Sequence, residues 1–506
     1  MSISIFCIMP FCNKLSTIWK QCKYRLYRST NLHVRSIADV YSEKSEFHWL
    51  SNCSPSFIID GDKVHVLNEP CEFYETLKIN ISQAKRRIAI ASLYLGTGKL
   101  EEELVGAIRH SLLNSRNNGN DLKVSILLDH TRGSRGQEKN SRTMLLPLLM
   151  EFPKHVDIAL FHTPALRGLL RWIIPEKYNE TIGVSHLKVY LTDDTFILTG
   201  ANLSNDYFTN RQDRYILIEK SPHIADYFEN LVTMVSGFSL QLHPDNVTSM
   251  SNVKFPAHPY KDWDRGRKFC GIANGTVNKF IKKWTKESEK VSKYSKGDTV
   301  IYPLLQMGLF GITQDENVTL KLLLDMPEAS TTHLATGYFN LTPHYSNCIL
   351  NSKGNYEILC AHPLANGFYK AGGIIGGIPD AFTNFAKEFF NHVQHFKHFE
   401  WIKVNEYIRS YWTFHAKGLW YTPQDDHYPN MSMIGSSNFG HRSVKRDLEN
   451  QTILLTSNEK LRYMLGKERD HVFKYIVKVT NETFEAIERR VPIWVKIISY
   501  FTRSFF

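Results

Sequence analysis

The fold and the site of this chain are best predicted from the stretch His186-Leu187-Lys188-Val189-Tyr190-Leu191-Thr192-Asp193. His415-Ala416-Lys417 repeats its H-x-K spacing. Alternate side chains of a β-strand point to opposite faces, so this spacing places an imidazole beside an ammonium group. Imidazole can attack phosphorus or carry a proton near neutral pH, and lysine stabilises the charge of a transferred phosphoryl group. The two copies therefore predict one phosphoryl-transfer site that uses two histidines.

The two halves also share residue types downstream of each H-x-K. Asn202 precedes Asp213 by 11 residues, and Asn438 precedes Glu449 by 11 residues. Each half thus supplies a histidine, a lysine, an asparagine and a carboxylate. A lone strand histidine is usually an ordinary core or surface residue, and asparagine is a common turn former. Four matched residue types in each of two halves favour a shared site over coincidence.

Strands and helices alternate in both halves, which predicts an α/β fold with sheets covered on both faces. In the first half, residues 70–85 and 100–113 have helical spacing, and residues 87–95 and 122–129 are typical of buried strands. The second half repeats the strands at residues 299–303, 333–339 and 356–360. Internal duplication is the simplest explanation.

Size and charge limit the classes of protein that fit. A chain of 506 residues exceeds the size at which one core usually keeps growing, so two lobes are expected. The net charge of +11 favours an anionic partner, either nucleic acid or acidic lipid, although a basic surface kept for solubility fits equally well. The eight cysteines include no C-x-x-C pair, which argues against a zinc ribbon or a secreted disulfide framework.

The first 38 residues are basic and hydroxyl-rich, with no acidic residue before Asp39. This composition is typical of a mitochondrial transit peptide, and a basic arm for nucleic acid or membrane is the alternative. No run of about 18 apolar residues occurs, so any membrane contact is expected to be peripheral. The expected organisation is a transit peptide over 1–38, a first lobe over 39–255, a basic linker over 256–297, a second lobe over 298–488 and an amphipathic membrane-contact segment over 489–506.

The motifs resemble those of the phospholipase D superfamily. His186, Lys188 and Asp193, followed by Gly200-Ala201-Asn202, are similar to its HxKxxxxD and G-x-N signature, and His415 and Lys417 with Gly435-Ser436-Ser437-Asn438 are similar to the second copy. Further segments, among them residues 91–98, 211–214 and 441–449, resemble its mitochondrial phosphatidyltransferases. The resemblance runs from about residue 57 to 456. It implies two similar lobes, each a mixed sheet flanked by helices, with the active site at the lobe interface.

The resemblance also implies roles for individual residues. A carboxylate would orient the histidine of the opposite half, which pairs Glu449 with His186 and Asp213 with His415. His186 would be the nucleophile and His415 the general acid and base, with the reverse assignment left open. The implied catalytic residues are His186, Lys188, Asp193, His415, Lys417, Asp213 and Glu449, and the implied substrate-binding residues are Asn202, Asn438, Ser436 and Arg442. No metal or other cofactor is implied.

The second motif departs from the family pattern, because Thr422 stands where its aspartate is expected. This departure raises the alternative of a lipid-binding scaffold with a decayed site. For an active enzyme, the resemblance implies transfer of the phosphatidyl group of CDP-diacylglycerol to sn-glycerol 3-phosphate through a phosphatidyl-histidine. Serine as the acceptor, and hydrolysis of DNA or RNA, are the alternatives within the superfamily.

Two apolar segments with basic residues support a lipid substrate over a nucleic acid. Residues 164–175 include Trp172 and two arginines, and residues 489–501 include Trp494, two arginines and a lysine. Both fit a helix that lies in a membrane interface beside anionic headgroups, and packing on the protein's own core is the alternative. The expected location is the matrix face of the inner mitochondrial membrane, with no nucleic acid as partner.

Overall fold

The computed structural model describes residues 47–250, 255–369, 371–372, 376–398 and 400–505. The chain divides into an N-terminal unit that ends at His48 and a second unit, Trp49–Phe506, which carries both H-x-K motifs. The predicted transit peptide over residues 1–38 lies outside the described residues.

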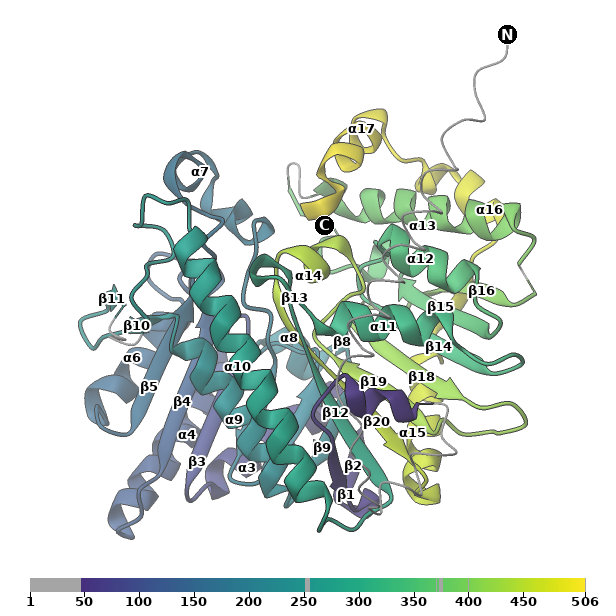
Figure 1. The fold of residues 1–506 in the computed structure, drawn as a ribbon. Coiled ribbons are helices and arrows are strands. Elements are labelled where there is room, and N and C mark those ends of the chain that lie inside the picture. Colours follow the sequence, from purple (N-terminus) through teal and green to yellow (C-terminus); the bar gives the residue numbers. More distant parts are fainter. Residues whose placement is uncertain (1–46, 251–254, 370, 373–375, 399, 506) are drawn as a thin grey trace. The chain divides into compact units, whose positions relative to one another are not determined.

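The first half of the second unit is built on a nine-stranded mixed sheet (Figure 1). Its central strands β3, β4 and β5 are parallel, and its other strand pairs are antiparallel. In spatial order its strands are β11 (Thr248–Ser249), β10 (Leu240–Leu242), β5 (Val156–Phe161), β4 (Lys123–Asp129), β3 (Arg87–Ala91), β6 (Val189–Thr192), β7 (Thr195–Thr199), β9 (Tyr215–Ile218) and β2 (Val64–Leu67).

The second half repeats this topology in a ten-stranded sheet. Its strands are β1 (Phe57–Ile59), β12 (Thr299–Met307), β20 (Leu448–Thr456), β19 (Met431–Gly435), β18 (Gly418–Thr422), β14 (Thr331–Thr336), β15 (Asn355–Ala361), β16 (Ile402–Tyr407) and β21 (Ile476–Lys478), with β13 (Ile312–Thr313) beside β12. The parallel trio β14, β15 and β16 corresponds to β3, β4 and β5, and β18, β19 and β20 correspond to β6, β7 and β9. The predicted duplication is therefore confirmed in the strand order.

Helices cover the sheets of both halves (Figure 1). They are α3 (Pro70–Gln83), α4 (Lys99–Asn117), α5 (His130–Gly133), α6 (Ser141–Glu151), α7 (Gly168–Ile173), α8 (Asn205–Thr209), α9 (Pro222–Ser236), α10 (Arg267–Ser292), α11 (Gln314–Leu324), α12 (Pro343–Leu350), α13 (Ile378–His395), α14 (His441–Lys445), α15 (Glu459–Val472), α16 (Asn481–Glu485) and α17 (Ile493–Thr502). The helical spacing that predicted α3 and α4 arises because one face of each helix is buried on the first sheet.

Two of the expected boundaries differ from the structure. Strand β1 pairs with β12, so residues 57–59 belong to the second sheet although they precede the first. The Lys-rich segment over 256–297, which was expected to be a basic linker, is also part of the core. It contains the 26-residue helix α10, which buries Phe269, Val277 and Trp284 in the core that both sheets share. The six lysines of α10 are exposed, as expected, because they occupy the opposite face of an amphipathic helix.

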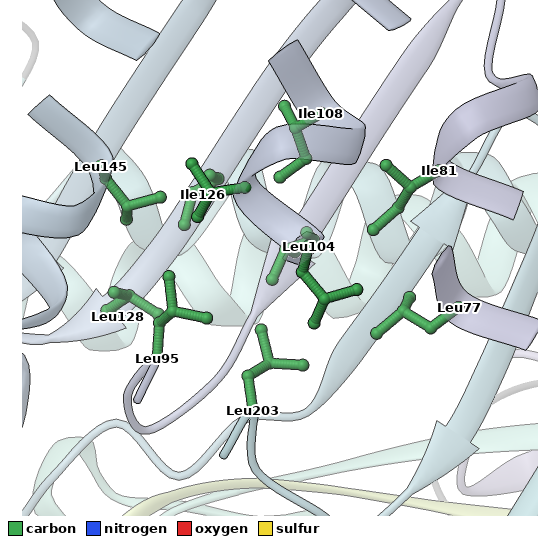
Figure 2. Close-up of a pocket in the computed structure, with 11 residues that line it drawn as sticks. Leu77, Ile81, Leu95, Leu104, Ile108, Ile126, Leu128, Leu145 and Leu203 are labelled. Atoms are coloured by element: carbon green, nitrogen blue, oxygen red, sulfur yellow. The ribbon is translucent and has the colours of Figure 1, made fainter. Parts of the chain in front are cut away.

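A small cavity of about 20 Å³ lies in the core of the first half, between α3, α4 and the sheet (Figure 2). Its lining is entirely apolar and includes Leu77, Ile81, Leu104, Ile126 and Leu203. A space of this size has room for about one water molecule and this lining offers it no polar partner, so we interpret the cavity as a packing defect.

Candidate active site

Each H-x-K segment lies against the opposite half of the chain. The strand β17 (Thr413–Phe414), just before His415, pairs in parallel with β8 (Arg211–Gln212) of the first half. The backbone of His186 donates a 2.8 Å hydrogen bond to the carbonyl of Leu448 in the second half, and that of His415 donates one of 2.8 Å to Gln212. Backbone pairing thus brings each histidine beside the carboxylate-bearing segment of the other half.

The two histidines are paired with the expected carboxylates. Nδ1 of His186 donates to Oε2 of Glu449 at 2.9 Å, and Nδ1 of His415 donates to Oδ2 of Asp213 at 2.6 Å. All four residues are buried. Since a carboxylate only accepts, these contacts favour the tautomer with the proton on Nδ1, which leaves the lone pair on Nε2. At His415, Nζ of Lys417 also lies 2.7 Å from Nδ1 and 3.2 Å from Nε2. The resemblance of the motifs to the phospholipase D superfamily implied both pairs.

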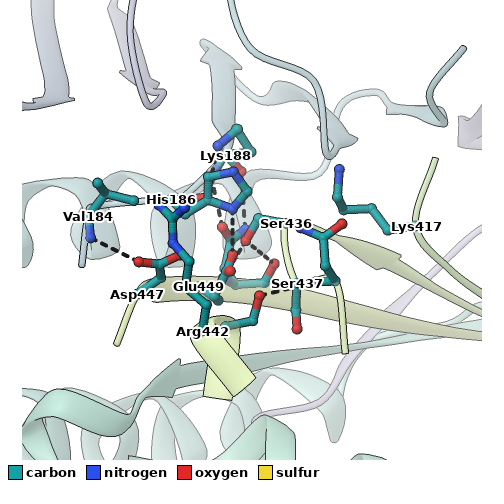
Figure 3. Close-up of polar contacts among 12 residues, drawn as sticks. Val184, His186, Lys188, Lys417, Ser436, Ser437, Arg442, Asp447 and Glu449 are labelled. Atoms are coloured by element: carbon teal, nitrogen blue, oxygen red, sulfur yellow. Dashed lines mark hydrogen bonds and ion pairs between the residues drawn. The ribbon is translucent and has the colours of Figure 1, made fainter. Parts of the chain in front are cut away.

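A buried lysine stands beside each ring. Nζ of Lys188 donates to the carbonyl of His186 at 2.9 Å (Figure 3). Nζ of Lys417 donates to the carbonyl of His415 at 2.7 Å. A Cβ built on Gly200 would lie 3.1 Å from Nζ of Lys417, so only glycine leaves room for that ammonium group. The G-x-N segment of the first half therefore lies against the lysine of the second.

Burial sets the charge of these groups. It lowers the pKa of His186 to about 4, with the charges of Lys188 and Lys417 adding to the effect, and it lowers the pKa of His415 well below its ordinary value. Burial also lowers the pKa of Lys188 to about 7 and that of Lys417 to about 8. Both imidazoles are therefore neutral at pH 7, as a nucleophile and a base require.

The carboxylates respond differently to burial. Burial raises the pKa of Asp213 to about 6. Burial also favours the protonated form of Glu449, but the positive charge of a protonated His186 and the hydrogen bonds to its carboxylate outweigh this, and the pKa of Glu449 lies below its ordinary value. Glu449 is thus suited to stabilise positive charge on the His186 ring.

The two half-sites differ at Nε2. The hydroxyl of Tyr207 lies 3.2 Å from Nε2 of His415 and accepts a 3.0 Å hydrogen bond from Nδ2 of Asn202. Among the described residues, no hydrogen bond reaches Nε2 of His186. The Oδ1 atoms of Asn202 and Asn438 are buried without a partner in the described part of the chain. Turning the Asn202 amide over would let Oδ1 accept from Tyr207 and would free its NH₂ group for a phosphoryl oxygen.

Asp193 is not part of this site, which corrects its expected place among the catalytic residues. It follows β6 at the end of the strand away from Lys188. Its carboxylate accepts hydrogen bonds from the backbone of Lys85, Arg86 and Arg87, at 3.0, 2.8 and 3.1 Å. Asp193 therefore ties the β6–β7 turn to the start of β3. Its counterpart Thr422 ends β18 opposite Thr331, so the missing aspartate removes no group from the catalytic centre.

Ser436 and Arg442 are held by other protein groups. The Ser436 hydroxyl accepts from the backbone of Asn450 at 3.1 Å and donates to its carbonyl at 3.3 Å, so it supports the strand that carries Glu449. The guanidinium of Arg442 pairs with Asp447 at 2.9 Å, and Asp447 also accepts from the backbone of Val184 (Figure 3). Ser436 and Arg442 therefore stabilise the segment that carries Glu449.

Two residues of the site were missed in the sequence. Asn450 accepts from the backbone N–H of Lys188 at 2.8 Å and donates to its carbonyl at 3.1 Å, which continues the pairing between the two halves. In the sequence, the position of Asn450 next to Glu449 could have indicated that it belongs to the site. Tyr207 had only its closeness to Asn202 as a signal, since no spacing predicts which tyrosine meets a distant histidine.

The described residues contain no group of three His, Cys, Asp or Glu side chains arranged to hold a metal ion. Two neutral imidazoles, each backed by a carboxylate and flanked by a lysine, instead provide a nucleophile, a base and positive charge. Together with the duplicated sheets, these groups form the two-histidine phosphoryl-transfer site that the motifs predicted.

Comparisons with known proteins give the family. No protein-family profile matches the chain. The chain is 46% identical over 486 residues to the mitochondrial CDP-diacylglycerol–glycerol-3-phosphate 3-phosphatidyltransferase of Gallus gallus, covering 91% of this chain and 86% of the relative. It is 34% identical to the enzyme of that activity from Saccharomyces pastorianus, covering 88% of each. The chain therefore belongs to the CDP-diacylglycerol–glycerol-3-phosphate 3-phosphatidyltransferase family.

A solved structure shares the fold. The phosphatidylserine synthase of Haemophilus influenzae Rd KW20 matches with a TM-score of 0.65 at 19% identity, over 90% of this chain and 96% of that protein. At this identity the likeness concerns the fold, which has two lobes with mixed sheets.

Proposed function

We infer that this chain transfers the phosphatidyl group of CDP-diacylglycerol to sn-glycerol 3-phosphate, forming phosphatidylglycerophosphate and CMP. The observation that carries this function is the pair of buried histidine–carboxylate contacts, His186 with Glu449 and His415 with Asp213, each formed between the two halves. They occur in a chain that is 34–46% identical to enzymes named for this reaction. Both substrates are anionic, in agreement with a site that holds two lysines.

In the first step, Nε2 of His186 attacks the phosphorus that joins the phosphatidyl group to CMP. The N–P bond forms, the P–O bond to CMP breaks, and CMP leaves with the electron pair. The ring becomes positively charged, and Glu449 stabilises that charge through Nδ1. Lys188 and Lys417 neutralise the charge that develops on the phosphoryl oxygens.

In the second step, the terminal hydroxyl of glycerol 3-phosphate attacks the same phosphorus. Nε2 of His415 takes the hydroxyl proton, the new O–P bond forms, and the N–P bond breaks to restore neutral His186. Asp213 stabilises the protonated His415 ring through Nδ1. In-line displacement places CMP and the acceptor on the face of the phosphorus opposite His186, which is the face that His415 serves.

The difference at Nε2 supports this assignment of the two histidines. A nucleophile needs its lone pair directed at the substrate, and among the described residues nothing is bonded to Nε2 of His186. A base is not impaired by a hydroxyl at its Nε2, because the acceptor hydroxyl replaces that of Tyr207 there. The reverse assignment requires the tyrosine hydroxyl to leave before the first step.

The location of the enzyme follows from its relatives and its surface. Relatives from Gallus gallus and Homo sapiens are named as mitochondrial, which supports a mitochondrial location. No helix in the described ranges is long and apolar enough to cross a bilayer. We place the protein at the surface of an anionic membrane, on the matrix face of the inner membrane, with no nucleic acid as partner.

Two helices support this membrane contact. Leu169 and Trp172 of α7 and Ile493 and Phe501 of α17 have more than 70% of their surface exposed. The two helices lie at the top of Figure 1, one on each half. Arg171, Arg490 and Lys496 are nearby basic residues that fit anionic headgroups. α17 is fixed to its half because Val495 packs on Phe382 and Phe385 of α13.

The function is tested with the purified protein, CDP-diacylglycerol in vesicles and either glycerol 3-phosphate or serine. We expect phosphatidylglycerophosphate as the product, and CMP release that depends on glycerol 3-phosphate. Release of CMP at the same rate with and without an acceptor would identify a hydrolase. A lipid product formed with serine but not with glycerol 3-phosphate would identify a phosphatidylserine synthase.

The two steps are separated by the exchange of labelled CMP into CDP-diacylglycerol, which needs no acceptor. His186→Asn should abolish both exchange and transfer. His415→Gln should slow transfer by roughly 10²–10⁴-fold and retain more of the exchange, because the phosphate of CMP is already ionised and needs no base. The opposite pattern in the two variants would reverse the assignment.

A further inference from the structure

The two half-sites carry an ion pair at equivalent positions but with the charges exchanged. In the first half, Asp206 of α8 pairs with Arg211 at 2.9 Å. In the second half, Arg442 of α14 pairs with Asp447 at 2.9 Å. In both cases the partners are five residues apart, and the second partner stands two residues before the carboxylate that holds a catalytic histidine.

This exchange places opposite charges beside the two carboxylates that orient the histidines. The segment that orients His415 carries the cation Arg211, whereas the segment that orients His186 carries the anion Asp447. Asp447 is buried, and one of its oxygens accepts from the backbone of Val184. On the segment that orients His415, which is the side that the acceptor uses, the charged group two residues before the carboxylate is therefore a cation.

Arg211 is close to the base and firmly held. Its guanidinium lies 4.5 Å from the ring centroid of Tyr207, whose hydroxyl lies 3.2 Å from Nε2 of His415. Nε donates to Thr413 at 2.9 Å and one terminal nitrogen donates to Asp206 at 2.9 Å. A fixed planar guanidinium one aromatic ring from the base is suited to bind an anionic group of the molecule whose hydroxyl the base deprotonates.

Two other arginines near the site are more fully neutralised. Arg132 lies 3.6 Å from Glu180, whose side chain is 20% exposed, and Arg442 lies 2.9 Å from Asp447, whose side chain is 5% exposed. The side chain of Asp206 is 56% exposed, so water screens its attraction for Arg211 more strongly. Of these three arginines, Arg211 therefore has the charge that its carboxylate partner neutralises least.

We propose that Arg211 binds the phosphate of the acceptor and makes the enzyme specific for glycerol 3-phosphate over unphosphorylated alcohols. The proposal rests on the proposed function and adds the residue that selects the acceptor. The acceptor spans the short path from His415 to Arg211, with its terminal hydroxyl at Nε2 of His415 and its phosphate at the guanidinium. Arg211 is a specificity residue and takes no part in bond making.

The test compares glycerol 3-phosphate with glycerol as acceptors for the wild type and for Arg211→Gln. Formation of phosphatidylglycerophosphate by the wild type is measured first, and its absence would refute the proposed function rather than this proposal. In Arg211→Gln we expect the KM for glycerol 3-phosphate to rise by roughly 10- to 100-fold, since a hydrogen-bonded charge pair is lost. The ratio of kcat/KM for glycerol 3-phosphate to that for glycerol should fall by a similar factor. For Arg211→Lys we expect a KM for glycerol 3-phosphate and an acceptor preference between those of the wild type and of Arg211→Gln.

Asp206→Asn is the matched control, because it breaks the same ion pair and keeps the guanidinium. If Arg211 binds the phosphate, Asp206→Asn should not raise the KM for glycerol 3-phosphate. If Arg211 only supports the fold through Asp206, both variants should raise it alike, and that result overturns the proposal. An Arg211→Gln enzyme whose preference between the two acceptors is unchanged overturns it as well.

Discussion

The hydroxyl of Tyr207 lies 3.2 Å from Nε2 of His415, whereas the equivalent residue of the second half, Ser443, is too short to reach Nε2 of His186 in this way. The ring of Tyr207 also meets that of His415 edge to face, with centroids 4.9 Å apart. In the duplicated halves, a tyrosine hydroxyl therefore lies at Nε2 of His415, whereas no equivalent hydroxyl lies at Nε2 of His186 among the described residues. This difference is the structural basis for giving the two histidines different tasks.

Removal of the Tyr207 hydroxyl should therefore affect the two steps unequally. In Tyr207→Phe, Asn202 and His415 lose a shared hydrogen-bond partner, and loss of a neutral hydrogen bond corresponds to roughly a two- to tenfold effect. We expect kcat for transfer to glycerol 3-phosphate to fall by that factor and the exchange of labelled CMP to change less. A variant in which exchange falls more than transfer would contradict this role.

Substitution of Asp193 should affect stability and leave the chemistry intact. Asp193→Ala removes the acceptor of three backbone N–H groups and places alanine at a φ of 50°. We expect the free energy of unfolding to fall by about 1–3 kcal/mol, measured by denaturant titration, with kcat/KM of the folded enzyme nearly unchanged. Asp193→Asn is the control, because asparagine tolerates this φ and should lose less stability. A selective loss of kcat in a stably folded Asp193→Ala enzyme would restore Asp193 to the catalytic group.

The pH dependence of kcat for the overall transfer should be a narrow bell. Below the pKa of Asp213, about 6, the carboxylate is protonated and no longer stabilises a charged His415, so the second step slows on the acid side. Above the pKa of Lys188, about 7, the ammonium group is lost, so the rate falls on the alkaline side. A bound phosphoryl group favours the ammonium form, so the alkaline limb of kcat should lie at higher pH than that of kcat/KM. A profile that is flat across this range would contradict both assignments.

The buried lysine should reduce stability while it serves catalysis. Lys188 has 1% of its surface exposed, and burial favours its uncharged form. Lys188→Met fills the same space without an ammonium group, and replacement of a buried charge by an apolar residue can stabilise a fold by about 1–4 kcal/mol. We expect Lys188→Met to abolish transfer and to raise the thermal midpoint, measured by calorimetry. A lower midpoint would mean that the lysine is required for the fold itself.

The exposed apolar face of α17 should bind membranes. The variant Ile493→Ser/Ile497→Ser/Phe501→Ser removes three exposed apolar side chains, each of which can contribute about 1.5–3 kcal/mol when fully buried in lipid. We expect binding to vesicles that contain anionic lipid to be lost in a flotation assay. Met150→Ser on α6 is the control, since Met150 is also exposed and should not affect binding. Unchanged flotation of the triple variant would exclude α17 as the contact.

Much of the fold and of the site could be predicted from the sequence because the pattern is repeated. The spacing of 11 residues between asparagine and carboxylate identified Asp213 and Glu449, and the structure pairs them with the histidines of the opposite halves. The role of Asp193 could not be predicted, because its partners at residues 85–87 lie more than 100 residues away. The core face of α10 was visible as Phe269, Val277 and Trp284 at helical spacing, but the lysines between them indicated only a basic linker with a solvated charged face.

Pairing between the halves has a consequence for the newly made polypeptide. Since β17 pairs with β8 and the backbone of His186 bonds to that of Leu448, neither imidazole acquires its carboxylate until both halves of the chain have met. An unfinished or clipped polypeptide that lacks the second half has no complete nucleophile and no base. We expect such a fragment to be inert towards CDP-diacylglycerol, so that only the assembled protein consumes this lipid.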